Sequence, residues 1–334
     1  MMNKMIVLLF ILLAFSNAKT ITVDNKYPYA GDYKTLQEAH DAASDGDVIY
    51  VAPSLVPYDA ITVTKKLSFY GVGFDILENI GEPLTISSSI SGEMTFSNGS
   101  SGSKIEGFDG RFSILVDVVN ITIKRNNLIQ IHITNGGSGT SILQNKLQVL
   151  EKNVGHGLIW IEDASNIAIF NNILYADPLG TSAIFGGDDL TIKNNVIRAS
   201  YDYYSRTAIF NYVNNSLIVN NIFTNFEYSF DSNNNIFQYN MEPGISLPDG
   251  FGNIKNVNMK TVFVDPDNYD FHLLPDSPAR SAGENGTDMG IYGGDAPFVD
   301  GGFPELPSIL QLVVPTVGSQ KGGLEIKFKA KSNN

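Results

Sequence analysis

The chain has 334 residues, 43% of them hydrophobic and 17% charged, which excludes a disordered chain and a bundle of membrane helices. With 22 Lys and Arg against 35 Asp and Glu, the net charge of −13 argues against a nucleic acid as a partner. The absence of cysteine excludes disulfides, thiolate metal sites and a cysteine nucleophile.

Residues 1–18 are predicted to form a secretory signal peptide. Lys4 supplies a positive start, and residues 5–15 form an apolar run that is too short for a bilayer, which takes about 20 residues. Ser16 and Ala18 are the small residues expected before a cleavage site. We therefore expect an exported protein, in the periplasm, at the cell surface or outside the cell, with no transmembrane segment in the mature chain.

A helix between two short strands is predicted next. Residues 21–24 (ITVD) have the pattern of an opening strand. Thr35 followed by Glu38 forms a capping box, which predicts a helix that continues to about Ala43. Gly46 and Asp47 then turn the chain into a strand at residues 48–51 (VIYV).

An Asn-rich motif recurs from about residue 120 onward, as IKRNN, ILQNK, IFNNI, IKNNV, IVNNI and FQYNM. One Asn of each motif serves as the anchor of a repeat, and the gaps between anchors are 19, 27, 23, 26 and 19 residues. The anchors are Asn126, Asn145, Asn172, Asn195, Asn221 and Asn240. Self-similarity with a period near 23 residues indicates a solenoid.

Positions at fixed distances from the anchors show the local structure of each repeat. The positions five before, three before and two after the anchor are apolar in 14 of 18 cases, where the composition predicts about eight. The first two of these positions are two residues apart, which is the period of a strand. The position six before the anchor holds only residue types that tolerate a left-handed backbone: Asn120, Gly139, Asn166, Asp189, Asn215 and Asn234.

Coils of about 23 residues made of turns, short strands and Asn bends predict an all-β protein, a parallel β-helix solenoid of roughly nine coils. The anchor Asn side chains should stack about 4.8 Å apart in a hydrogen-bonded ladder. We expect the β-helix domain to occupy residues 19–295, with an N-terminal cap at about residues 20–52. Leucine-rich repeats share the period, but their Leu consensus is absent.

The last part of the chain, residues 296–334, is predicted to be a C-terminal tail. Gly301, Gly302, Pro304 and Pro307 break the chain before two strand-like segments at residues 309–314 and 324–330. These segments predict a β-hairpin that packs on the final coil, and a sorting or anchoring tail is the alternative.

The Asn columns and the run at residues 35–53 (TLQEAHDAASDGDVIYVAP) resemble the secreted right-handed parallel β-helix proteins of the pectin-lyase-like superfamily. Residues 270–273, 277–279 and 288–290 resemble the closing segment of such proteins, so the resemblance covers about residues 20–295. It implies an exported monomer that binds a polysaccharide or surface glycan and in some relatives cleaves it, as a lyase or a glycoside hydrolase. Because the fold also serves inert adhesins, a non-catalytic surface solenoid is the alternative, and whether the chain is an enzyme stays open.

A glycan-binding site is expected where the long gaps between anchors insert extra segments, at residues 149–157, 175–180 and 199–206. Stacked coils should place these segments side by side, and aromatic and Arg side chains suit the apolar faces and acidic groups of sugars. The predicted binding residues are Tyr175, Arg198, Tyr203, Tyr204 and Arg206. A Tyr-rich loop that merely covers the edge of the coil is the alternative.

No catalytic residue can be fixed from the sequence, and the candidates are Lys193, Arg198, Asp188 and His156. A lyase would need Lys or Arg as the base that takes the C5 proton of a uronate. The GHG at residues 155–157 and the GDD at residues 187–189 resemble elements of polygalacturonases, but in the reverse order and without a preceding NTD.

Ca²⁺ is the one cofactor that the sequence leaves open. Asp177, Asp188 and Asp202 are the candidate ligands, because carboxylate oxygens are what Ca²⁺ prefers. Their spacing matches no known calcium motif, so the metal site is an open hypothesis.

Overall fold

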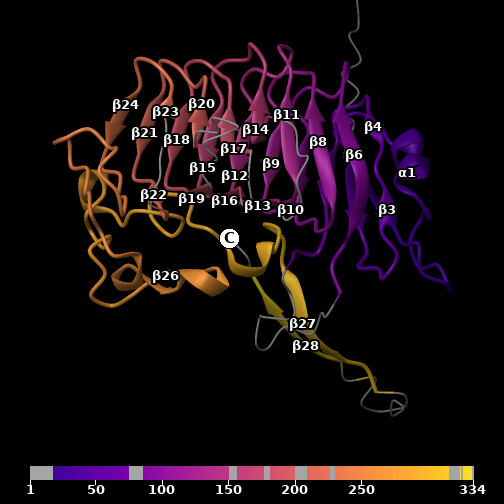
Figure 1. Cartoon of the computed structure of the whole chain (residues 1–334). Helices are drawn as coiled ribbons and strands as arrows, with labels where there is room; N and C mark the ends of the chain where they lie inside the picture. Colours follow the sequence, from indigo (N-terminus) through magenta and orange to yellow (C-terminus); the bar gives the residue numbers. More distant parts are fainter. Residues whose placement is uncertain are drawn as a thin grey trace, which may run out of the picture.

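The computed structural model describes residues 18–74, 86–149, 156–176, 181–199, 209–225, 230–315, 324 and 326–332. Three parallel sheets run along its length, and successive coils add short strands to them (Figure 1). The parallel β-helix predicted from the sequence is therefore confirmed. Among the described residues, no helix is both long and apolar enough to cross a membrane.

The three sheets share the coils between them. The ten-stranded sheet consists of β1 (Thr20–Val23), β2 (Val48–Val51), β5 (Ser68–Tyr70), β7 (Lys104–Glu106), β9 (Thr122–Lys124), β12 (Ser141–Leu143), β15 (Ala168–Phe170), β18 (Thr191–Lys193), β21 (Leu217–Val219) and β24 (Ile236–Gln238). The five-stranded sheet consists of β10 (Asn127–Leu128), β13 (Lys146–Val149), β16 (Ile173–Ala176), β19 (Val196–Ala199) and β22 (Ile222–Phe223). The nine-stranded sheet consists of β3 (Tyr58–Asp59), β4 (Thr62–Val63), β6 (Ile90–Phe96), β8 (Phe112–Val116), β11 (Gln130–Ile133), β14 (Gly157–Ile161), β17 (Ser182–Phe185), β20 (Phe210–Asn211) and β23 (Phe230–Asp231).

The helix α1 (Leu36–Ala42) covers the N-terminal end of the solenoid (Figure 1). The predicted capping box is present, since the Thr35 side chain accepts a hydrogen bond from the Glu38 amide and the Glu38 carboxylate accepts one from the Thr35 amide. Leu36 and Ala39 are buried in the main hydrophobic core, so this helix shields the apolar end of the first coils from water.

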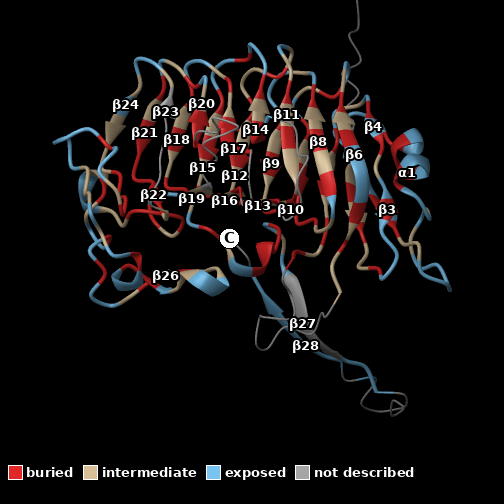
Figure 2. Ribbon diagram, in the orientation of Figure 1, coloured by how far each residue is buried: buried red, intermediate tan, exposed pale blue. Residues whose placement is uncertain are grey.

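The core of the solenoid is a stack of aliphatic side chains in register, which Figure 2 shows as red stretches on most strands of the solenoid. Ile142 pairs with Ile169, Ile169 with Ile192, and Ile192 with Ile218 on adjacent parallel strands, and none of the four is exposed. Of the three positions predicted to face inward, all are buried in every coil except the last, where Asn235 and Phe237 are partly exposed. The inward stripe is therefore confirmed.

The anchor Asn residues form the predicted ladder inside the solenoid. In each step the backbone amide and the Nδ2 of one Asn donate to the Oδ1 of the next, at 2.8–3.0 Å for the amide. The rungs are Asn126, Asn145, Asn172, Asn195, Asn221, Asn240 and also Asn253, which the sequence analysis did not include because it follows Asn240 by only 13 residues. The six predicted anchors are completely buried. Each Nδ2 also donates to a carbonyl of the previous coil, so one side chain ties three coils together.

Two columns of residues have a left-handed backbone. All six residues that stand six positions before an anchor have positive φ, from 49° at Asn215 to 75° at Gly139, as the residue types predicted. The residue immediately before each anchor is also left-handed, with φ of 53–58°: Arg125, Gln144, Asn171, Asn194, Asn220 and Tyr239. This second column turns the chain sharply between the ten-stranded and the five-stranded sheet.

After the last coil, residues 257–305 run back along the outside of the five-stranded sheet, and we call this segment the strap (Figure 1). Its apolar side chains, such as Phe271 and Ile291, form a second hydrophobic cluster with Ile173, Val196 and Ile222, which face outward from that sheet. The strap contains β25 (Phe263–Asp265), β26 (Asp270–Leu273) and the 3₁₀ helices η2 (Met259–Thr261), η3 (Pro266–Asn268), η4 (Glu284–Gly286) and η5 (Asp300–Gly302).

Side chains of the second left-handed column hold the strap by its backbone. Asn171 Nδ2 donates to the carbonyls of Ile291 and Gly293, both at 2.8 Å. Four other members of the column make further hydrogen bonds to the strap: Asn194 to Asp288 and Gly290, Asn220 to Glu284 and Thr287, Gln144 to Ala296 and Pro297, and Arg125 to Phe303. A single column of side chains thus fixes the path of the strap across successive coils.

The tail forms the predicted hairpin, but the hairpin does not lie on the final coil. β27 (Ser308–Val313) and β28 (Lys327–Lys331) pair antiparallel, and β28 is exposed along its whole length. Glu305, just before the hairpin, forms ion pairs with Lys104 of β7 and Lys124 of β9. The expectation that the hairpin packs on the final coil is wrong, because the strap first carries the chain back to the middle of the solenoid.

Ion pairs hold the chain at Glu305, where the strap ends. Although burial opposes its ionisation, the Lys124 hydrogen bond and the charges of Lys124, Lys104 and Arg125 hold the pKa of Glu305 below its usual value. Lys104 also lies 2.6 Å from the buried carboxylate of Glu106, and this partner outweighs the desolvation of the ammonium, so the pKa of Lys104 is raised.

Candidate functional site

A row of aromatic rings crosses the outer face of the nine-stranded sheet. His132 of β11 pairs with Trp160 of β14, and Trp160 pairs with Phe185 of β17, so the three side chains leave the sheet in register. Tyr212 follows β20 on the next coil. Trp160 points outward between the buried Ile159 and Ile161, as the sequence predicts from strand alternation.

Most faces of these rings are covered by one another. The His132 and Trp160 rings are stacked, with centroids 3.8 Å apart and planes at 2°. His156 packs against both Trp160 and Phe185, at 4.7 and 4.6 Å between centroids. Tyr212 meets Phe185 at 5.5 Å and 78°, and 57% of Tyr212 is exposed. Accessible apolar ring surface is therefore concentrated at the Tyr212 end of the row.

A cavity of about 470 Å³ lies at that end of the row. Trp160, Phe185 and Tyr212 supply its aromatic wall. The turns that follow β14, β17 and β20 supply its polar residues, Glu162, Asp163, Asp188 and Asn214. Three consecutive coils thus build one site, with rings that can contact the apolar face of a sugar and oxygens that can accept hydrogen bonds from hydroxyl groups.

The turns can take this shape because they contain residues with a left-handed backbone. Gly186 has φ of 77°, and a Cβ added there would lie 2.1 Å from the Ile161 carbonyl oxygen, so only Gly fits. Asp163 and Tyr212 also have positive φ, at 43° and 58°. Each turn therefore bends tightly where its side chains line the cavity.

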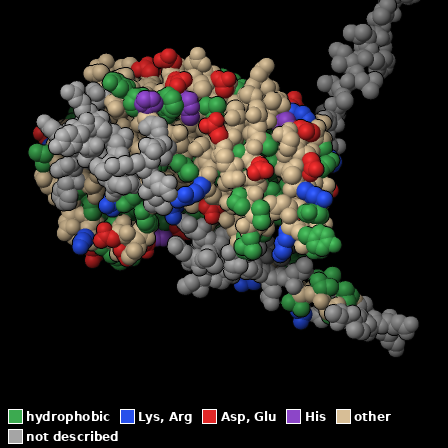
Figure 3. Space-filling model, turned by 45° about the vertical axis from the view of Figure 1, so that its right-hand side comes forward, with side chains coloured by type: hydrophobic (Ala, Val, Ile, Leu, Met, Phe, Trp, Pro, Cys, Tyr) green, Lys and Arg blue, Asp and Glu red, His purple; other side chains and the backbone are tan. Residues whose placement is uncertain are grey.

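The cavity is acidic. Glu162 Oε1 lies 3.1 Å from His132 Nε2, and Asp188 Oδ1 accepts a hydrogen bond from Asn215 Nδ2 at 2.6 Å. Within the described part of the chain, no Lys or Arg contributes to the lining. Figure 3 shows histidine side chains among hydrophobic ones on this side of the molecule, with acidic side chains close by.

Those predicted binding residues that the structure describes lie on a different surface from the cavity. Tyr175 and Arg198 are in register on β16 and β19, and the guanidinium carbon of Arg198 lies 4.9 Å from the Tyr175 ring centroid. Tyr269 of the strap meets Tyr175 edge-on at 4.9 Å, so the strap borders this pair. Tyr203, Tyr204 and Arg206 lie outside the described residues, and the loop site as a whole remains a prediction.

The catalytic candidates are distributed over separate surfaces. Lys193 lies beside Phe170 on the ten-stranded sheet, and its Nζ is 3.3 Å from the carboxylate of Glu284 in the strap. It therefore stands on a different sheet from Arg198. Asp188 lines the acidic cavity, and His156 packs on the aromatic row.

Metal binding has no support among the described residues, which contain no group of three His, Asp or Glu side chains placed to hold an ion. Of the proposed Ca²⁺ ligands, Asp188 is in the cavity. Asp177 and Asp202 lie outside the described residues.

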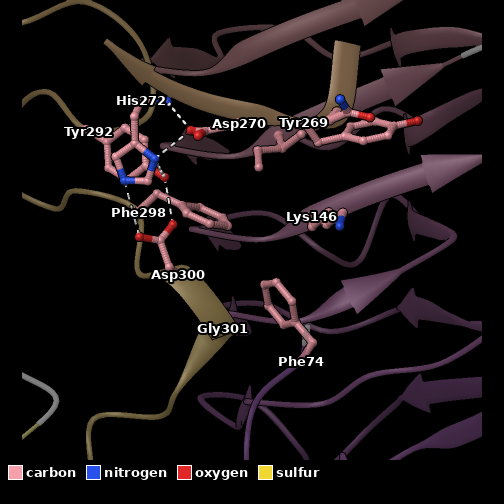
Figure 4. A pocket seen from close by; sticks show the side chains of 11 residues that line it. Phe74, Lys146, Tyr269, Asp270, His272, Tyr292, Phe298, Asp300 and Gly301 are labelled. Atoms are coloured by element: carbon pink, nitrogen blue, oxygen red, sulfur yellow. Dashed lines mark hydrogen bonds and ion pairs between the residues drawn. The ribbon is translucent and has the colours of Figure 1, made fainter. Parts of the chain in front are cut away.

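A second cavity, of about 330 Å³, lies where the strap crosses the five-stranded sheet (Figure 4). Its polar groups bind one another: His272 Nδ1 lies 2.7 Å from Asp270 Oδ1, His272 Nε2 lies 3.4 Å from Asp300 Oδ2, and the Tyr292 hydroxyl donates to Asp300 at 2.6 Å. Burial, with the Asp300 hydrogen bond and charge, raises the pKa of Tyr292 far above its usual range, so the hydroxyl stays a donor. This cluster joins three parts of the strap, and we assign it a structural role.

The aromatic row was missed as a site from the sequence alone. His132, Trp160 and Phe185 are 28 and 25 residues apart, close to one coil each, so they form a column like that of the anchors. Tyr212 follows Phe185 by 27 residues and stands one position after Asn211, the residue that pairs with Phe185. Loops of different length separate them from the anchors, which hides the column when positions are counted from the Asn ladder. No family model matches the sequence, and no curated protein matches it either.

Proposed function

We propose that this chain is an exported parallel β-helix protein, pectin-lyase-like in architecture, that binds a polysaccharide in the acidic cavity beside Tyr212. The observation that carries the proposal is the exposed Tyr212 ring, which lies at the end of a row of aromatic residues in contact and beside hydrogen-bond acceptors from three consecutive coils. Sugars present apolar C–H faces and polar edges, and this cavity offers a partner for each.

The sequence supports the exported location and the architecture of the proposal. The predicted signal peptide at residues 1–18 supports export, and an exported protein has access to extracellular glycans. The resemblance to pectin-lyase-like proteins supports a carbohydrate ligand, because that resemblance covers the Asn columns and the N-terminal cap.

Binding without cleavage is the form of the proposal that the geometry favours. Hydrolysis of a glycosidic bond needs one carboxyl group that donates a proton and a second that acts as base or nucleophile, and different environments set these roles. Glu162, Asp163 and Asp188 are all exposed, so none of the carboxyl groups of the cavity has the buried environment of a general acid. The protein would then act as a glycan-binding surface solenoid.

The experiment is affinity electrophoresis of the mature protein in gels that contain single polysaccharides, both neutral and acidic, followed by calorimetric titration with oligosaccharides of each one that retards it. Tyr212→Ala should weaken binding at least about tenfold, because it removes the accessible ring. Tyr27→Ala is the matched control, since Tyr27 is 82% exposed and lies in the N-terminal cap. Each variant is first checked for an unchanged melting temperature.

The surface around Tyr175 and Arg198 is tested in the same assay. If Arg198→Ala abolishes binding while Tyr212→Ala does not affect it, the glycan binds at the surface predicted from the sequence and the cavity is not the site. If none of the polysaccharides retards the wild-type protein, the proposed function is refuted.

A further inference from the structure

The cavity beside Tyr212 would oppose a negatively charged ligand. Glu162, Asp163 and Asp188 are exposed members of its lining. The described residues of the lining include no Lys or Arg that would balance them, and the imidazole of His132 lies 3.1 Å from the Glu162 carboxylate. A carboxylate that enters this cavity would meet like charges at short range, where repulsion is least screened by salt.

The same oxygens suit an uncharged sugar. A carboxylate is an acceptor with two oxygens, so it can take hydrogen bonds from two neighbouring hydroxyl groups, and a bond to a charged acceptor is stronger than one between neutral groups. The Tyr212 ring can contact the C–H face of the sugar at the same time. The net charge of −13 acts in the same direction, because it lowers the concentration of any polyanion near the surface.

Building on the proposed glycan-binding function, we infer that the cavity selects a neutral glycan with adjacent hydroxyl groups and rejects polyuronates. This differs from the uronate ligand that a pectin-lyase-like resemblance suggests.

The test uses ligand pairs that share one sugar backbone and differ at C6, where one member is charged and the other is neutral. One pair is an oligogalacturonate and its fully methyl-esterified form, and the other is a cello-oligosaccharide and the cellouronate made by oxidising its C6 hydroxyls. In each pair that binds, the neutral member should bind at least about tenfold more tightly in calorimetric titrations at low ionic strength. The difference should narrow at about 0.5 M salt, where charges are screened within a few ångströms.

A charge variant assigns the effect to the cavity. The double substitution Asp163→Asn and Asp188→Asn should reduce the ratio of neutral to uronate affinity several-fold. The matched control is Asp267→Asn with Asp276→Asn, two exposed carboxylates of the strap, which changes the net charge equally and should leave that ratio unchanged.

Each outcome has one interpretation. Uronates that bind as tightly as their neutral partners, or a control pair that changes the ratio as much as the cavity pair, would overturn the inference on charge and leave glycan binding intact. If neither these four ligands nor the wider panel binds, it is the proposed function that fails.

Discussion

Replacing Asn195 by Ala removes one rung of the internal ladder and tests what holds adjacent coils in register. The Asn195 Oδ1 accepts from the Asn172 amide at 2.8 Å and from Asn172 Nδ2 at 3.0 Å. Its Nδ2 donates to the Ile169 carbonyl at 2.8 Å, to the Lys193 carbonyl at 3.0 Å and to Asn221 Oδ1 at 2.9 Å. Five hydrogen bonds are lost from a site with no solvent access.

The magnitude follows from which groups keep another partner. Asn172 Nδ2 still donates to two carbonyls, the Lys193 carbonyl still accepts from the Asn171 amide, and Asn221 Oδ1 still accepts from the Asn195 amide. The Asn172 amide is left as a buried donor without its acceptor, which costs about 1–3 kcal/mol of stability. The Ile169 carbonyl loses a hydrogen bond that contributes about 1 kcal/mol. We therefore expect a loss of about 2–4 kcal/mol in the free energy of unfolding.

Urea denaturation followed by circular dichroism measures this loss, and a thermal melt should show a decrease of about 3–6 °C in a chain of this length. The control is Asn98→Ala, the same substitution at an exposed turn. A ladder variant no less stable than this control would refute the argument that the ladder stabilises the solenoid.

Three more predictions concern the core, the end of the solenoid and the tail. Ile192→Ala should lower the free energy of unfolding by about 2–5 kcal/mol in the same denaturation assay, because it leaves a cavity between Ile169 and Ile218. Burial raises the pKa of Glu242, so its contribution to stability is fully present below about pH 4.5, where the carboxyl is protonated, and is lost as the pH rises through the folded-state pKa. Glu242→Gln should therefore raise the melting temperature at pH 7, and this gain should vanish toward pH 4. The pKa of Glu305 is lowered, so its ion pairs stabilise the tail above about pH 4.5 and are lost as the pH falls through the lower folded-state value. The protection of the Phe303, Glu305 and Leu306 amides against hydrogen exchange, after correction for the intrinsic pH dependence of exchange, should accordingly fall in acid. Glu305→Gln should show the low protection already at pH 7, and protection unaffected by either change would contradict the role of Glu305.

The repeating part of the fold could be predicted because each coil solves the same physical problem with the same residue types. Asn recurs at the ladder, and Asn, Asp or Gly recurs at the first left-handed column, because these residues suit the ladder hydrogen bonds and the left-handed backbone better than other residues do. The second left-handed column was not recognised, because Arg125, Gln144 and Tyr239 share only a backbone conformation and not a chemistry.

The path of the strap and the position of the cavity could not be predicted, for a different reason. The strap contacts join residues far apart in the sequence, such as Asn171 and Ile291, which are 120 positions apart, and a non-repeating segment leaves no column in the sequence. Tyr212 appeared in the sequence as one more aromatic residue near a turn. Its exposure and its neighbours became apparent only when three coils were stacked.

The strap also changes how this solenoid should come apart. Coils that contact only their neighbours can unravel one at a time from an end, as expected for a one-dimensional array. Here one segment is hydrogen-bonded to coils from Phe74, which donates its amide to the Gly301 carbonyl, to Asn220, which binds η4. Releasing any of these coils alone must break contacts that also hold the others, so this stretch should open as a single cooperative block. The first strands, β1 and β2, lie beyond the hydrogen bonds that the described residues make to the strap, and fraying of the molecule should begin there.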